Sequence, residues 1–469
     1  MADTQTAKRS GSSLLPMLVA VLLIPAALGS SHTIFNDGDV SWHIASGRWI
    51  LEHGRIPTTD PFSFTWMGKH WVPFEWLADV IYASGYRLAG YAGVSALATA
   101  ALMALNAIVY FNAARWIRPV LVGFGLLIVM NVVLIPMLLA RPHLFVWPLL
   151  AAWMWVLMRA REKDRAPPLA AALLMSLWAN LHGSFVFGLA IAAAFGLEAL
   201  ISSADRIRAF RQWLLFGVAC AIAVCINANG LDGALYPFKY TDLEMLPMID
   251  EWKPSSVSVT PFFFVTLAII AVLIVWKRPR LHSVRWLLLA ACLGAALYQA
   301  RHQAMFVIVA AMILPEGLAR GQQRARGEEP QTPVVIAAVG ALLLLAVRLS
   351  MPLTPPENQT NPWKLIASVP PELRSQPVLN YYSFGGPLIL SGIRPYIDGR
   401  GDMYGDPFVL GYGDIVHGNQ AAFDEAVRRW NIRWVIMAHD QKKFIAMLRK
   451  TPGWRQIRHN EVGAVYVRS

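Results

Sequence analysis

Long apolar runs separated by short polar connections are the main pattern along the chain. A membrane-spanning helix needs about 20 predominantly apolar residues, and several of these runs are slightly shorter. The pattern predicts an α-helical polytopic membrane protein with about eleven spans. The predicted segments are 13–30, 76–113 (an interfacial piece followed by a span), 120–140, 144–159, 167–181, 185–203, 213–228, 260–276, 284–299, 302–318 and 333–350.

The first apolar run has two interpretations. It follows Lys8 and Arg9 and ends in small residues at 26–30, which is the pattern of a cleaved signal peptide and also of a retained first span. We favour the retained span, because the rest of the chain is also apolar enough to be embedded in a membrane. The basic flank then places the N-terminus in the cytoplasm.

Basic residues occur in every second connection, all on the side of the membrane that holds the N-terminus. Cytoplasmic connections are enriched in Lys and Arg, so this distribution supports the predicted spans. An odd number of spans places the C-terminus outside. The residues are Arg115 and Arg118; Arg159, Arg161, Lys163 and Arg165; Arg206, Arg208 and Arg211; Lys277, Arg278, Arg280 and Arg285; and Arg320, Arg324 and Arg326.

The region 351–469 differs from the preceding transmembrane domain, 1–350. Pairs of prolines at 355–356 and 370–371 mark a linker. Beyond it, "PVLNYYSFGGPLIL" is typical of a strand, a turn and a second apolar piece, while "AAFDEAVRRW" and "QKKFIAMLRK" have helical spacing. "IRWVIMAH" and "VGAVYVR" predict strands. We therefore expect a small extracytoplasmic α/β domain.

Composition agrees with a membrane protein. The 469-residue chain is 56% hydrophobic and 15% charged, whereas soluble domains carry about 25% charged residues. The net charge of +12 lies in the short connections, which argues against a nucleic-acid partner. The three cysteines lie inside apolar runs with no CxxC spacing, so the sequence predicts no disulfide framework.

Polar clusters recur in the connections predicted to face outside. Each has a structural interpretation alone, such as a turn, a cap or an arginine reaching the headgroups. Their convergence on one membrane face instead indicates a site, because ionisable groups at membrane depth are costly. The clusters are Asn36, Asp37, Asp39, His43, Arg48 and Asp60 in the long first loop (31–75); Arg141 and His143; Asn180 and His182; Glu251; and Arg301, His302 and Gln303.

Paired acids and arginines at a wet membrane face suit a phosphate-linked lipid donor. A carboxylate deprotonates an acceptor hydroxyl or orients the sugar. An arginine holds the phosphate through paired hydrogen bonds. The histidines leave a divalent cation open, although no pair has the spacing of helical metal ligands.

The arrangement resembles the GT-C superfamily of polytopic glycosyltransferases. A closer resemblance is to largely uncharacterised bacterial membrane proteins with a glycosyltransferase-like domain, carried by "GRWILEHGRIPTTDPFSFT", "EWL", "RPHLF", "WANLHGSF", "EWKP" and "RPYIDGRGDMYG". The resemblance implies an inner-membrane enzyme with its site on the extracytoplasmic side, a polyprenyl-phosphate sugar donor and an unspecified lipid, glycan or protein acceptor.

The resemblance also implies roles for residues. Asp37 or Asp39 matches the acid of the first loop, although Gly38 separates acids that are often adjacent in the superfamily. By position, Arg141 and Arg301 would bind the donor phosphate. His43, His143, Asn180, His182, Glu251 and His302 would line the substrate site.

Two questions stay open at this point. Asp398, Arg400 and Asp402 alternate in "YIDGRGDMYGD", either to cap the site and bind acceptor or as a turn with locally paired charges. The chain as a whole is either a transferase, a transporter of a lipid-linked glycan, or a noncatalytic assembly factor for envelope polysaccharide. A transporter would place charges at mid-membrane in broken helices, and an assembly factor would tolerate loss of both Asp37 and Asp39.

Overall fold

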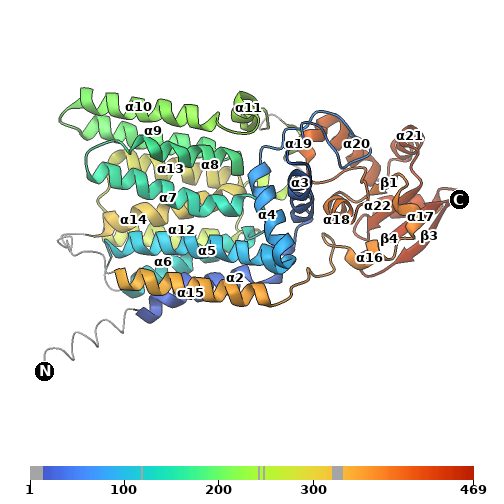
Figure 1. Ribbon diagram of the computed structural model, residues 1–469, viewed down its shortest axis with the longest axis horizontal. Coiled ribbons are helices and arrows are strands. Elements are labelled where there is room, and N and C mark those ends of the chain that lie inside the picture. Colours follow the sequence, from blue (N-terminus) through green and yellow to red (C-terminus); the bar gives the residue numbers. More distant parts are fainter. Residues whose placement is uncertain (1–13, 118–119, 241–242, 247–248, 320–330) are drawn as a thin grey trace.

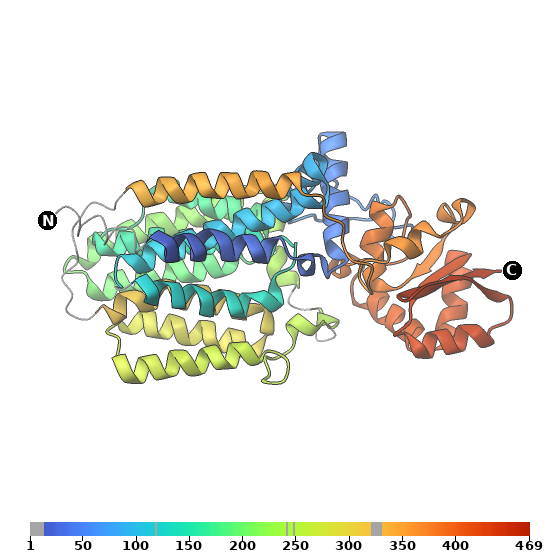
Figure 2. The same ribbon diagram turned by 90° about the horizontal axis from the view of Figure 1, so that it is seen from below.

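The computed structural model describes residues 14–117, 120–240, 243–246, 249–319 and 331–469. Its long helices lie side by side in one bundle, and a smaller domain with a sheet lies beyond one end of the bundle (Figure 1). A view turned by 90° shows the same two parts (Figure 2). Two helices of residues 31–90 lie between them (Figure 1), and we call this segment the first outer region after its predicted side of the membrane.

Helices occur at each segment where a span was predicted. Four of them are long and apolar enough to cross a membrane: α5, α7, α9 and α10. The bundle contains η1 (Val19–Leu23) continuing into α2 (Ile24–Gly29), α5 (Tyr91–Ala114), α6 (Val120–Leu134), α7 (His143–Glu162), α8 (Leu173–Leu181), α9 (Phe185–Ser202), α10 (Arg206–Val224), α12 (Pro261–Lys277), α13 (Ser283–Tyr298), α14 (Gln303–Leu318) and α15 (Gln331–Ser350).

Burial differs between the inner and outer helices of the bundle. α14 buries most of its side chains, whereas α10 and α12 expose large apolar residues such as Ile222, Val272 and Trp276. Such an extended exposed apolar surface is unfavourable in water. It is what a lipid environment requires, and it agrees with a membrane protein.

The first outer region contains two helices, α3 (Asp39–His53) and α4 (Trp76–Ala89). The Asp37 carboxylate accepts a hydrogen bond from the Asp39 N–H (3.1 Å), which caps the start of α3. Gly54, at φ +63°, ends the helix. Gly90, at φ +58°, separates α4 from α5. The predicted segment 76–113 thus contains two helices, of which α5 is long and apolar enough to cross a membrane, and the interfacial position of α4 stays a prediction. α3 was not recognised within the predicted loop.

The C-terminal domain is built on a four-stranded sheet of order β1-β2-β4-β3. β1 (Val378–Asn380) pairs in parallel with β2 (Trp434–Ala438). β4 (Gly463–Arg468) is antiparallel to both β2 and β3 (Trp454–His459). The helices of the domain are α16 (Trp363–Ala367), α17 (Pro371–Arg374), α18 (Gly385–Leu390), α19 (Gly401–Tyr404), α20 (Asp406–Val416), α21 (Gln420–Trp430) and α22 (Lys442–Lys450).

The sheet buries both faces. Val435 and Met437 of β2 point into one apolar core, whereas Trp434 and Ile436 point into the other. The expected α/β domain is thus present, and both predicted helices and both full-length predicted strands lie where expected. The second apolar piece after β1 folds as helix α18. β3 was missed because most of its side chains are polar or exposed.

The C-terminal domain docks on the first outer region through hydrogen bonds. The Thr65 hydroxyl donates to the carbonyl of Tyr396 (2.7 Å), and the Asn361 amide donates to the carbonyl of Phe35. The Asn358 amide donates to the side-chain oxygen of Asn36 (3.0 Å). These bonds place the domain directly beside the start of α3.

Candidate active site

Arg141 is the centre of a cluster of ion pairs contributed by three separate connections. Its Nε contacts Asp37 Oδ2, one terminal nitrogen lies 2.8 Å from Asp39 Oδ2, and the other lies 3.2 Å from Glu251 Oε2. Arg141 precedes α7, Asp37 and Asp39 begin α3, and Glu251 lies in η6 (Asp250–Trp252). The structure thus brings four of the predicted site residues into contact.

The two aspartates have different affinities for protons. Burial raises the pKa of Asp39 to about 6, and the Asp37 carboxylate adds to this rise, whereas Arg141, His43 and the Trp42 indole oppose it. Burial also acts on Asp37, but its contacts with Arg141 outweigh burial and lower its pKa. Neighbouring carboxylates whose pKa values diverge commonly divide the roles of proton acceptor and electrostatic partner. Asp39 is the better placed proton acceptor of the two.

His43 is held by a carboxylate of α4. Its Nδ1–H donates to Asp79 Oδ1 over 2.6 Å, and the Ser46 hydroxyl donates to the other oxygen of Asp79 over 2.6 Å. The Trp42 ring lies against the imidazole, with centroids 3.6 Å apart. A carboxylate at Nδ1 fixes both the tautomer and the orientation of a histidine. The imidazole is therefore fixed close to the paired aspartates.

The guanidinium of Arg301 has different neighbours from that of Arg141. Its guanidinium lies 4.2 Å from the centroid of the Trp252 ring. Among the described residues it forms no ion pair, but Glu251 and Glu75 lie near enough to interact with it electrostatically. His302 follows it, packed edge-on against Phe187. Burial, followed by Arg301, lowers the pKa of His302 to about 4. This part of the site therefore contains a cation next to a neutral imidazole.

His182 pairs with Glu75, which the sequence analysis did not single out. His182 Nε2 lies 3.5 Å from Glu75 Oε1. Burial lowers the pKa of His182 well below its ordinary value, and Arg301 adds to the effect. Burial raises the pKa of Glu75 well above its ordinary value, with further contributions from Asp79 and Asp402. Burial thus favours the neutral form of both partners, and Arg141 and Arg301 act electrostatically on each of them.

A spacing in the sequence points to Glu75 and Asp79. The two acids stand four residues apart, Glu75 immediately before the mainly apolar segment 76–113 and Asp79 within its first turn. Carboxylates at this spacing share one helix face, and an acid in an apolar helix indicates a functional site. Treating the segment only as an interfacial piece concealed this signal.

Two further predicted residues make structural hydrogen bonds. His143 Nε2 donates to the carbonyl of Met137 (3.0 Å) at the turn before α7. The Asn180 amide donates to the carbonyls of Ser176 and Ile226 (2.8 and 2.9 Å) and accepts from the Trp76 indole (2.7 Å). Asn180 thereby ties α4, α8 and the end of α10 together.

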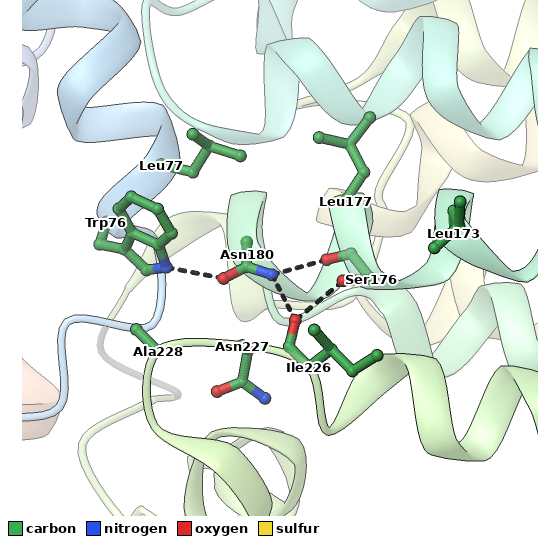
Figure 3. A pocket seen from close by; sticks show the side chains of 9 residues that line it. All are labelled: Trp76, Leu77, Leu173, Ser176, Leu177, Asn180, Ile226, Asn227 and Ala228. Atoms are coloured by element: carbon green, nitrogen blue, oxygen red, sulfur yellow. Dashed lines mark hydrogen bonds between the residues drawn. The ribbon is translucent and has the colours of Figure 1, made fainter.

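Asn180 also borders an open, mainly apolar pocket of about 500 Å³. Leu77, Leu173, Leu177 and Ile226 line it, and Asn180 hydrogen-bonds there to Trp76, Ser176 and Ile226 (Figure 3). The substrate-binding roles of Asn180 and His143 stay predictions.

The described residues contain no group of three or more His, Cys, Asp or Glu side chains arranged to hold a metal ion. Each of the four site histidines contacts a different group. His43 contacts Asp79, His143 the Met137 carbonyl, His182 Glu75, and His302 Phe187. No protein-family model and no curated protein sequence matches the chain.

Proposed function

We propose that this protein is a GT-C-like glycosyltransferase of the bacterial inner membrane. It would transfer a sugar from a polyprenyl-phosphate donor to an extracytoplasmic acceptor, with eleven spans, a cytoplasmic N-terminus and an extracytoplasmic C-terminal domain. The observation that carries the proposal is the contact of Arg141 with Asp37 and Asp39, beside an Arg301 that has no carboxylate partner among the described residues.

In this proposal Asp39 is the general base. The acceptor hydroxyl oxygen attacks the anomeric carbon, Asp39 takes the hydroxyl proton, and the bond from the anomeric carbon to the phosphate oxygen breaks. The bonding electrons leave with the polyprenyl phosphate, so no external reductant or oxidant is needed. Asp37 stays ionised and holds Arg141 in place.

Arg301 is the better candidate for binding the donor phosphate. Three carboxylates already neutralise Arg141, so Arg141 has little capacity left for an added anion. The guanidinium of Arg301 stacks on Trp252 and forms no ion pair among the described residues, although Glu251 and Glu75 act on it electrostatically. A neutral His302 can donate an N–H group to a phosphate oxygen without competing for this charge. This division of labour refines the expectation that both arginines bind phosphate.

Two alternative functions fit the site less well. A transporter would place its charges in interrupted helices at mid-membrane, whereas Asp37, Arg141 and Glu251 lie in connections between helices. A noncatalytic assembly factor would not need an acid whose proton affinity is adjusted beside an arginine. The direct test is release of labelled polyprenyl phosphate by the purified full chain in lipid nanodiscs, using radiolabelled polyprenyl-phosphate sugars.

Arg301→Ala is expected to raise KM for the donor about 10- to 100-fold, because a charge-assisted hydrogen bond contributes about 1.5–3 kcal/mol. Arg301→Lys should recover part of this loss, since it keeps the charge without the planar fork. Arg449→Ala, which removes an exposed arginine of α22, is the matched control. An unchanged KM in Arg301→Ala would place the phosphate elsewhere.

The pH dependence of kcat/KM tests the role of Asp39. The pKa of Asp39 is raised from 3.8 to about 6, so the ionised base is lost as the pH falls through 6. We expect kcat/KM to fall about tenfold per unit below this point. A profile that stays flat down to pH 4.5 would contradict the assignment of Asp39 as the base.

A further inference from the structure

The loop of the C-terminal domain that contains Gly399 lies directly on the Asp39 side chain. A Cβ atom at position 399 would overlap Asp39 Oδ1, and it would lie 2.7 Å from Asp39 Cγ and 2.9 Å from Trp42 Nε1. Real Cβ atoms do not approach other atoms this closely. Only glycine therefore lets the loop rest on the carboxylate without displacing it.

Arg400 holds this loop in place. Its side chain is 1% exposed and forms paired hydrogen bonds with Asp398 (2.8 and 2.7 Å). Its third bond reaches Asp60 of the first outer region (2.7 Å). The guanidinium also stacks on Trp71, 4.7 Å from the ring centroid. A buried, fully paired arginine gives the loop little freedom to move away from Asp39.

Two more glycines bring the same surfaces into backbone contact. A Cβ at Gly38, just before α3, would overlap the carbonyl oxygen of Ser383. A Cβ at Gly386, in α18, would overlap the carbonyl oxygen of Gly38. Figure 1 shows α18 and α19 facing α3 and α4 across this junction. The two domains thus meet at main-chain distance around Asp39.

The residues that follow the loop, 402–406, hydrogen-bond to the connection between α10 and α12. The Tyr236 hydroxyl of α11 (Gly230–Tyr240) donates to Asp402. The Asp406 carboxylate accepts from the backbone N–H groups of Glu244 and Met245, at 2.9 Å each. The loop 398–406 therefore spans the gap between the first outer region and the connection that leads to Glu251.

We propose that the loop 398–402 forms the outer wall of the site, and that Gly399 is a positioning residue that lets the loop cover the Asp39 carboxylate and shield it from water on that side. The catalytic meaning of that position rests on the proposed function, whereas the packing does not. The charged or titratable groups that face Asp39 are Asp37, Arg141 and His43. All three come from the bundle and the first outer region, and the loop supplies the shielding.

The test is Gly399→Ala in the full chain in lipid nanodiscs. Carbodiimide couples to protonated carboxyl groups, so peptide mass spectrometry of Asp39 coupling against pH reports its titration without any need for enzyme activity. In the wild type we expect a midpoint near 6. In Gly399→Ala we expect it to fall by about one unit or more toward the ordinary value, because water reaches the carboxylate.

Gly411→Ala is the matched control. Gly411 lies in α20 of the same domain, and an added Cβ there meets nothing within 4 Å. It should titrate like the wild type. If Gly399→Ala does not fold, Asp60→Asn loosens the loop without added bulk and should lower the midpoint in the same direction. An Asp39 midpoint equal to that of Gly411→Ala in both variants would overturn the proposal.

Kinetics separate this proposal from the proposed function. Where transfer is measurable, Gly399→Ala should lower kcat about 10- to 100-fold and leave KM for the donor within about threefold, since Arg301 contacts Trp252 and, among the described residues, no residue of the loop. A shifted Asp39 midpoint with no transfer by any form of the protein would support the proposed role of the loop and refute the proposed transferase activity. Transfer that is equal in Gly399→Ala and Gly411→Ala would support the transferase and refute the wall.

Discussion

Asp39→Asn is expected to lower kcat for sugar transfer by about 10²- to 10⁴-fold, the usual contribution of a general base. Asparagine has nearly the same shape and can still accept a hydrogen bond from Arg141, but it cannot take a proton from the acceptor. KM for the donor should change little, because Asp39 does not contact the proposed phosphate position. The measurement is initial-rate transfer by the full chain in nanodiscs at pH 7.5.

Asp250→Asn is the control for this substitution. Asp250 adjoins Glu251 in sequence, yet its side chain is 92% exposed and pairs only with Lys253 among the described residues. Its loss should leave kcat within about twofold, as expected of a solvated surface pair. If Asp39→Asn retains more than about a tenth of the wild-type rate, the base is another group. If both aspartates can be lost without effect, the assembly-factor hypothesis gains support.

Arg400→Leu is expected to destabilise the C-terminal domain by about 3–5 kcal/mol. Removing one partner of a buried ion pair leaves the other charge without compensation, and here both Asp60 and Asp398 are at most 1% exposed. Thermal unfolding followed by tryptophan fluorescence should show a melting temperature lower by about 10 °C or more. Arg400→Lys keeps the charge but cannot bond to both aspartates in the same geometry, so its melting temperature should lie between those of Arg400→Leu and the wild type.

Arg428→Leu provides the comparison for this effect. Arg428 pairs with Glu425 at 2.6 Å, but its side chain is 75% exposed, so its removal should change stability by less than about 1 kcal/mol. Equal melting temperatures for Arg400→Leu and Arg428→Leu would show that Asp60 and Asp398 are hydrated in the folded protein, which would contradict this prediction.

Elements with a strong local pattern were predictable from the sequence. Apolar length located the bundle helices, and alternation located β2 and β4, because both signals depend only on neighbouring residues. β3 and α3 lack such a pattern. Trp454–His459 is largely polar, and α3 mixes buried serine, histidine and glycine with apolar residues, so each depends on tertiary packing for its stability.

The sequence predicted which residues form the candidate site better than it predicted the ion pairs between them. The predicted sidedness brought Asp37, Asp39, Arg141 and Glu251 to one face, and the structure places them in contact. The residues next to Arg141 and Arg301 in the sequence do not show that only Arg141 forms ion pairs, because its three carboxylate partners lie far away in sequence. Arg400 illustrates the same limit. The local pairing with Asp398 was one of the two interpretations of its loop, whereas the pairing with Asp60, 340 positions earlier, was not predicted, and acceptor binding by the loop stays a prediction.

That separation of 340 residues sets an order of events during biosynthesis. Asp60 is synthesised long before Asp398 and Arg400, so their buried ion pairs form only after synthesis has passed position 400. Until then the Asp39 carboxylate lacks the loop that lies on it. Folding of this loop is therefore the late step that completes the surroundings of Asp39.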